Sequence, residues 1–205
     1  MRRQLGREGA PKLNTSQDAE LYLSFAGIFH RPQPEISQHL EELIDLWVDE
    51  IGVSEDKLET LRRFCADFPP GESRLNALWE HYIPLFETGK VEAPPYASVY
   101  LGDEGRVMGK ETFAVQDFYR MAGYEIGKEK PEIADHLAVE LEFLALLARD
   151  GESELIAEFK RKHFFPFLRH ILPRIRETRR PVYSVAAELL EKWQFNLKKE
   201  GDFVG

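Results

Sequence analysis

Apolar residues recur along this chain at intervals of three and four positions, the spacing of an amphipathic helix. In the first half, Ser16 precedes the first apolar stripe, Ser54 is a candidate N-cap of the third, and Pro84 ends the fourth. The stripes are Leu21, Phe25, Ile28 and Phe29; Ile36, Leu40, Leu43, Ile44, Trp47 and Ile51; Leu58, Leu61, Cys65 and Phe68; and Leu75, Leu78, Trp79 and Tyr82. Each stripe predicts one helix.

The second half predicts a central helix that opens after Pro131, a favourable first-turn residue. Its main apolar face is Ile133, Leu137, Leu141, Leu144 and Ala148, and its other sides carry Val139, Phe143, Leu146 and Leu147. A helix that is apolar on most faces is buried. Two further helical patterns follow, over 155–172 with an interruption at Pro166, and over 182–197.

Residues 87–110 separate the two halves and contain repeated glycines and prolines, with strand-like alternation only at 96–100. A long irregular segment inside a compact domain is usually functional or disordered, and the aromatic residues and prolines of this one favour a functional role. We therefore predict an all-α, single-domain fold of about eight to ten helices over 14–205, with a long central loop and a flexible tail at 1–13.

Composition limits the classes of protein to which this chain can belong. The chain has 205 residues, 43% of them hydrophobic, which is ample for one core. The single cysteine, Cys65, excludes an internal disulfide framework and lies on an apolar stripe, as a structural cysteine does. No apolar run is long enough to span a membrane. The pair Arg2-Arg3 lacks the apolar run of an export signal, so we expect a cytoplasmic protein.

The net charge of −9 argues against a nucleic-acid partner. It suits a positively charged partner, or it only maintains solubility.

Enzyme motifs are missing. Gly89-Lys90 and Gly109-Lys110 lack the other residues of a phosphate-binding loop, and no Glu-x-x-His pattern of a di-iron bundle occurs. His136 and Glu140 share one helix face, so a helical metal-dependent enzyme remains an alternative that needs ligands from elsewhere.

Two segments stand out as candidate binding elements. In 87–100, prolines hold the backbone extended, and Tyr96 and Tyr100 either anchor a peptide ligand or fill the core below the loop. In 130–137, Asp135 either stabilises a helix N-terminus or, with its neighbours, forms an exposed acidic pocket that pairs with arginines of a bound peptide. We expect Asp135 and His136 to contact such a peptide, with a helix-surface or loop-facing histidine paired to a carboxylate as the alternative for His136.

These segments resemble the TorD/DmsD family of redox-enzyme maturation chaperones, whose wider group includes the NarJ-like proteins. The first motif is Tyr82-Ile83-Pro84-Leu85-Phe86 followed, after a spacer, by Glu92-Ala93-Pro94-Pro95-Tyr96-Ala97-Ser98-Val99-Tyr100, where Ala93 is an insertion relative to the family pattern. The second is Lys130-Pro131, three residues, then Asp135-His136-x-x-x-Glu140-Leu141.

The resemblance implies a cytoplasmic, non-enzymatic chaperone. It would bind the twin-arginine leader or apo-form of a molybdopterin-containing oxidoreductase of the dimethyl-sulfoxide-reductase type, and assist cofactor insertion and export proofreading. By motif match, the peptide-binding residues would be Tyr82, Leu85, Phe86, Glu92, Pro95, Tyr96, Ser98, Tyr100, Asp135, His136 and Glu140, with Leu85 and Phe86 expected in the core.

The remaining expectations concern ligands and assembly. We expect no resident cofactor and no metal, because molybdopterin belongs to the client enzyme. Some members of the group bind guanine nucleotide weakly, but no phosphate-binding loop supports this here. A scaffold that binds a folded partner without its leader is a further alternative. The protein would be a monomer or a domain-swapped dimer.

Overall fold

The computed structural model describes residues 15–102, 105–127 and 132–195. This part of the chain contains ten α-helices and two π-helical turns. They are α1 (Thr15–Phe29), α2 (Pro34–Glu50), α3 (Glu55–Asp67), α4 (Glu72–Tyr82), η1 (Ile83–Glu87), α5 (Ala97–Leu101), α6 (Lys110–Met121), α7 (Leu137–Asp150), α8 (Ser153–Phe159), η2 (Lys160–Phe164), α9 (Phe165–Glu177) and α10 (Pro181–Gln194). Within these ranges the only β pairing is an isolated bridge between Tyr96 and His136. The all-α prediction is confirmed.

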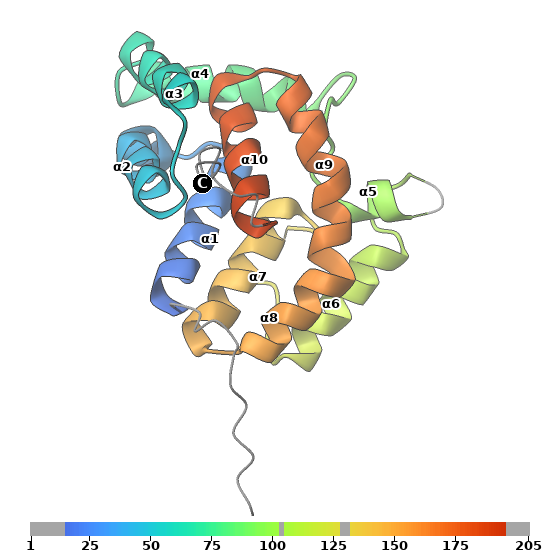
Figure 1. Cartoon of the computed structure of the whole chain (residues 1–205). Coiled ribbons are helices and arrows are strands. Elements are labelled where there is room, and N and C mark those ends of the chain that lie inside the picture. Colours follow the sequence, from blue (N-terminus) through green and yellow to red (C-terminus); the bar gives the residue numbers. More distant parts are fainter. Residues whose placement is uncertain (1–14, 103–104, 128–131, 196–205) are drawn as a thin grey trace, which may run out of the picture.

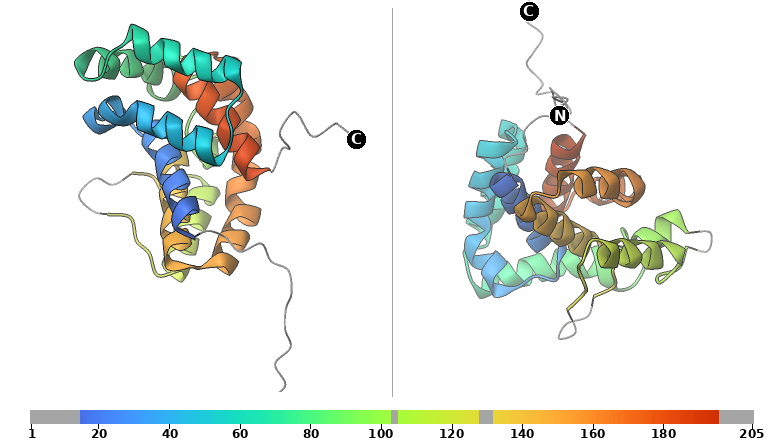
Figure 2. Two further views of the ribbon diagram at one scale, coloured as in Figure 1. Left: turned by 60° about the vertical axis from the view of Figure 1, so that its left-hand side comes forward. Right: turned by 90° about the horizontal axis from the view of Figure 1, so that it is seen from below.

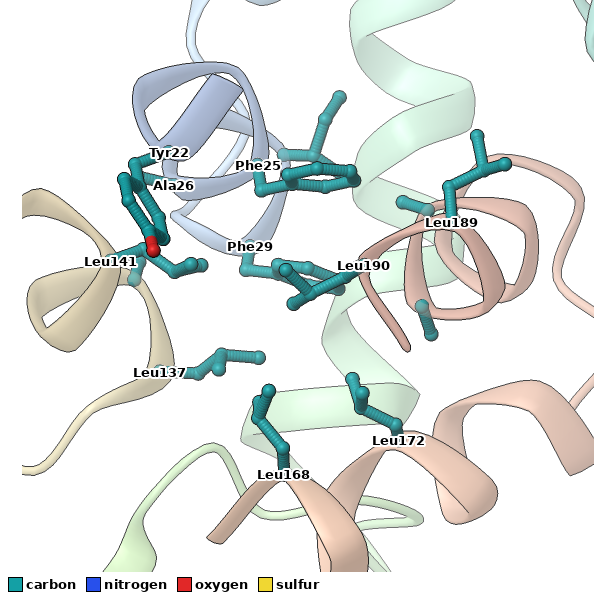
Figure 3. Close-up of a cluster of buried hydrophobic side chains, with 14 of the residues drawn as sticks. Tyr22, Phe25, Ala26, Phe29, Leu137, Leu141, Leu168, Leu172, Leu189 and Leu190 are labelled. Carbon is teal, nitrogen blue, oxygen red and sulfur yellow. The ribbon is translucent and has the colours of Figure 1, made fainter. Parts of the chain in front are cut away.

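The core forms where α1, α7, α9 and α10 converge. The most extensive helix pairing within the described ranges is α1 against α7. Figure 3 shows side chains of all four helices pointing into one cluster; those labelled are Tyr22, Phe25, Ala26, Phe29, Leu137, Leu141, Leu168, Leu172, Leu189 and Leu190. As the apolar pattern predicts, α7 is buried on nearly every face.

The other helices cover the two ends of this core. Figure 1 and the left view of Figure 2 show α3 and α4 at one end, with α8 and α6 at the other. The short helix α5 lies against α6 and α9. None of the described helices combines the length and the apolar character that crossing a membrane requires.

The predicted start of the central helix is wrong. Pro131 lies outside the described residues, and 132–136 are not helical. Helix α7 begins at Leu137 because His136 has an extended backbone and its ring Nδ1 accepts a 3.1 Å hydrogen bond from the N–H of Ala138. An N-cap of this kind satisfies a free donor at the first turn.

The central segment also differs from the prediction of one long loop. Residues 97–101 of this segment form α5. Helix α6 follows over 110–121, where the apolar pattern predicts no helix. Pro166 lies in the first turn of α9, which continues to Glu177 despite Pro173. The predicted flexible tail at 1–13 and residues 196 and 197 of the last predicted helix lie outside the described residues.

Candidate functional site

The two sequence motifs meet in space through backbone hydrogen bonds. The carbonyl of Pro95 accepts from the N–H of Leu137 at 2.8 Å, and the N–H of Ala97 donates to the carbonyl of Asp135 at 2.9 Å. The Tyr96–His136 bridge lies between these bonds. The segment before α5 is thereby fixed against the segment before α7.

Asp135 is buried at this junction, with 0% of its surface exposed. Its Oδ2 accepts a 2.7 Å hydrogen bond from the backbone N–H of Ser98, which is itself fully buried. The expected exposed acidic pocket at Asp135 is therefore wrong: the carboxylate caps the first turn of α5 inside the protein.

His136 is also buried, with 2% of its surface exposed. Its ring stacks on His30 with centroids 5.7 Å apart and meets the edge of Tyr96 at 5.2 Å. Burial, reinforced by the nearby positive charges of His30 and Arg31, lowers the pKa of His136 to about 3. The ring is thus neutral and internal, and within the described residues it lacks the carboxylate partner that the alternative of a helix-surface or loop-facing histidine includes.

Glu140 lies one turn further along α7 and is fully buried. Neither carboxyl oxygen has a hydrogen-bond partner within the described part of the chain. Burial, together with the charge of Asp135, raises the pKa of Glu140 well above its usual range. The group is therefore a protonated acid inside the core, where direct contact with a ligand would require the helices to open.

Tyr82, Leu85 and Phe86 also pack internally. The rings of Tyr82 and Phe86 lie 5.0 Å apart, and Phe86 meets Tyr183 of α10 at 5.8 Å. The expectation that Leu85 and Phe86 belong to the core agrees with their burial.

Tyr96 and Tyr100 face different neighbours although they are four residues apart. Tyr96 precedes α5 in an extended conformation and its hydroxyl lies 3.4 Å from Glu132. Burial and the charge of Glu132 raise the pKa of Tyr96 to about 12. Tyr100 lies within α5 and stacks on His170 of α9, with ring centroids 6.2 Å apart.

Glu92 lies outside the junction as well. It pairs with Arg180 at 2.7 Å, at the start of α10. The structure therefore gathers Pro95, Tyr96, Ser98, Asp135 and His136 around one junction, packs Tyr82 and Phe86 in the core, and places Glu92 and Tyr100 elsewhere.

A groove opens beside the junction, with a volume of about 340 Å³. Its apolar side chains come from α6, α7 and the segment after α6, and three glutamates and His30 lie among them. The lining residues are His30, Tyr119, Tyr124, Glu125, Ile126, Gly127, Glu132, Val139, Glu142, Phe143 and Leu146. The groove thus joins an apolar floor to negative charge at its edge.

The groove residues were not among the predicted site residues. The sequence feature that indicates the groove is the second apolar stripe of the central helix, formed by Val139, Phe143 and Leu146. This stripe points away from the main buried face of the helix. Within the described residues, no group of three or more histidine, cysteine or acidic side chains is arranged to hold a metal ion. Burial raises the pKa of the Cys65 thiol, which disfavours the reactive thiolate.

Comparisons with known proteins agree with one another. Residues 33–172 match the family model described as nitrate reductase delta subunit. The chain is 25% identical to the Haemophilus influenzae protein named "Probable Tat proofreading chaperone DmsD", over 90% of this chain and 94% of that protein. It is 28% identical to the chaperone protein TorD of Vibrio parahaemolyticus, over 70% of this chain and 58% of TorD.

A solved structure is similar as well. A protein from Archaeoglobus fulgidus, described as a redox enzyme maturation protein, superposes with a TM-score of 0.60 and 26% sequence identity. The match covers 95% of this chain and 99% of that one.

Proposed function

Because this chain belongs to the nitrate reductase delta subunit family, we propose that it is a maturation chaperone for a molybdopterin-containing oxidoreductase of the dimethyl-sulfoxide-reductase type. A general chaperone role is supported by the relatives that align with most of the chain and are named chaperones. In this proposal the protein acts in the cytoplasm, binds the leader and the apo-form of its client, and retains them until the cofactor is inserted and export can proceed.

The groove beside the junction is the proposed site for the leader, and it is the observation that carries the proposal. A twin-arginine leader combines two guanidinium groups with an apolar segment. Val139, Phe143 and Leu146 supply apolar contact, and Glu132 and Glu142 supply carboxylates that arginine binds in a bidentate manner. An acidic edge also speeds the encounter with a basic peptide.

The motif residues then act mainly by holding the groove in shape. Tyr96 lies at its edge, because its hydroxyl is near Glu132, and it is the motif residue best placed to touch the leader. Asp135 and His136 fix the segments that precede α5 and α7. Substituting them would alter leader binding through the groove rather than by removing a direct contact.

Calorimetric titration with synthetic leaders tests this function. Each candidate twin-arginine leader is titrated into the protein beside a variant leader in which both arginines are lysines. We expect saturable binding to one leader and weaker binding of its variant, because lysine cannot form the bidentate pair. Absence of binding to every leader would contradict leader recognition and leave recognition of the client body, which co-purification with a leaderless apo-enzyme would detect.

A further inference from the structure

Positive charge is concentrated in one part of this acidic protein. Between Lys160 and Arg180 the sequence has eight lysine or arginine residues and one acidic residue, Glu177, a net charge of +7 in a chain whose total is −9. The segment consists mainly of η2 and α9. Such segregation of charge is not needed for solubility, which a mixed surface already provides.

Helix α9 exposes this charge on one face. Phe167, Leu168, Ile171, Leu172 and Ile175 are buried in the core and account for one side of the helix. Arg169, His170, Arg174 and Arg176 remain exposed on the other side. The positions of these basic residues therefore form a strip along α9. Figure 1 shows α9 on the side of the molecule opposite α2.

Two of these arginines are held in place without an acidic partner. The guanidinium of Arg174 lies 5.3 Å from the centroid of the Tyr100 ring, and that of Arg169 lies 5.7 Å from the Phe195 ring. Neither forms an ion pair with any residue in the described ranges. In contrast, Arg176 pairs with Glu191, and Arg180 pairs with Glu92 at 2.7 Å. The two aromatic rings thus position guanidinium groups that have no ion-pair partner within the described residues.

Two hollows flank Pro173, one on this face and one between α9, α10 and α3. One, of about 620 Å³, is lined by Glu92, Arg169, His170, Pro173, Arg174, Glu177 and Thr178. The other, of about 560 Å³, is lined by Lys57, Thr60, Pro173, Arg176, Glu177, Arg179, Ser184, Val185 and Glu188. Neither shares a lining residue with the groove proposed for the leader. The basic face of α9 is therefore a surface distinct from the groove, with hollows of its own.

We propose that the outer face of α9 is a second docking surface that binds an acidic segment of a protein partner. Arg169 and Arg174 are five positions apart on the helix, which gives an axial distance of about 7.5 Å and a rotation of about 140° about the axis, and both line the hollow of about 620 Å³. Carboxylates two residues apart in an extended chain lie about 6.7 Å apart, so an extended segment lying across that hollow can place one carboxylate at each arginine. Each carboxylate would accept two hydrogen bonds from one guanidinium.

The chemistry favours carboxylates over a nucleic-acid backbone. Glu92 and Glu177 line the same hollow as the two arginines, and the whole chain is negative. A continuous phosphate backbone would be repelled by both, whereas a short acidic segment needs to contact only the arginines. The proposal does not depend on leader binding, because it concerns different residues.

Fluorescence anisotropy tests the proposal with a labelled peptide of alternating glutamate and serine, and with the same peptide carrying glutamine in place of glutamate. At 50 mM salt we expect the acidic peptide to bind at least about tenfold more tightly than its glutamine counterpart. The double variant Arg169→Glu with Arg174→Glu should weaken that binding at least about tenfold. The milder pair Arg169→Gln with Arg174→Gln serves if the charge reversal disturbs folding.

A matched control carries the same change of charge elsewhere. Arg62→Glu with Arg63→Glu alters two exposed arginines of α3 and should leave the affinity within about twofold. Equal binding of both peptides, or equal losses in both double variants, would overturn the proposal. Tighter binding of inorganic polyphosphate than of the acidic peptide, lost in the same α9 variant, would overturn it in favour of a phosphate ligand.

Discussion

The carboxylate of Asp135 accepts a 2.7 Å hydrogen bond from the backbone N–H of Ser98, so a residue just before α7 caps the first turn of α5. The carbonyl of Asp135 accepts from the neighbouring N–H of Ala97 as well. One residue thereby ties two distant segments together at the edge of the groove. The expected acidic contact residue is instead a structural clamp.

Removing this clamp should destabilise the protein. Asp135→Ala leaves the buried N–H of Ser98 without its acceptor, which costs about 1–3 kcal/mol of unfolding free energy. Urea denaturation measures the change. Ser98→Ala is the matched control, because it keeps the backbone donor and removes only a hydroxyl that has no hydrogen-bond partner within the described residues. Equal stability of Asp135→Ala and the wild type would contradict the clamp.

Glu140 should make stability depend on pH in a particular direction. Its pKa is raised on folding, so the folded protein keeps the proton while the unfolded chain loses it above about pH 4.5. Stability is then lost as the pH rises, by about 1.4 kcal/mol per unit until the folded pKa is reached. Glu140→Gln removes this loss and should be more stable than the wild type at pH 8 but not at pH 4.

The control for this comparison is Glu154→Gln, which changes an exposed residue of α8. Denaturation at pH 4, 6 and 8 should give it the same pH dependence as the wild type. A Glu140→Gln variant with no gain at pH 8 would mean that the carboxyl is ionised in the folded state.

His136 should make stability depend on pH in the direction opposite to Glu140, with stability lost as the pH falls. Burial lowers its pKa from 6.5 to about 3, so below pH 6.5 the unfolded chain takes up a proton that the folded protein does not. The stability that the neutral ring provides is lost by about 1.4 kcal/mol per unit as the pH falls towards 3. His136→Asn keeps an N-cap acceptor without a titrating ring, and it should lose less stability between pH 7 and pH 4. Parallel curves for variant and wild type would show that His136 is protonated in the fold.

Arg74 should be essential to the packing of α4. It is fully buried, and it donates to the carbonyls of Phe68 and Ser37 at 2.8 and 3.1 Å and to the carboxylate of Glu41 at 2.6 Å. Arg74→Leu removes the donor from these two carbonyls and breaks the pair with Glu41, and it should lower the unfolding free energy by about 3 kcal/mol. Arg63→Leu, whose arginine pairs with Glu59 at the surface, should cost less than about 1 kcal/mol. Similar losses for the two variants would contradict this role.

The sequence predicts the helices whose burial follows their own periodicity. Leu40, Ile44 and Trp47 are buried at the spacing that the stripe of α2 requires, and the apolar character of α7 on most sides matches its central position. These features depend on residues close together in the sequence, and local pattern is sufficient to find them.

What the sequence does not predict depends on distant partners. Helix α5 is capped by Asp135, 37 positions from Ser98, and this cap cannot be read from neighbouring residues. Taken alone, the residues of α5 show the alternation of a short strand. Arg74 is buried because carbonyls of two other segments surround it, while its neighbour Leu75 is only half-buried. The groove combines His30, which follows α1, with residues of α6, α7 and the segment between them, and no single motif contains it.

The central claim is that the acidic edge of the groove binds the arginines of the leader, and calorimetric titration of a groove variant tests it most directly. Glu132→Gln with Glu142→Gln should weaken binding of the client's leader about 5- to 30-fold, if each lost ion pair contributes about 0.5–1 kcal/mol. Glu55→Gln with Glu72→Gln changes the net charge equally at exposed positions on α3 and α4, and it should leave the affinity unchanged. Unchanged leader affinity in the groove variant, or the same loss in both variants, would contradict the claim.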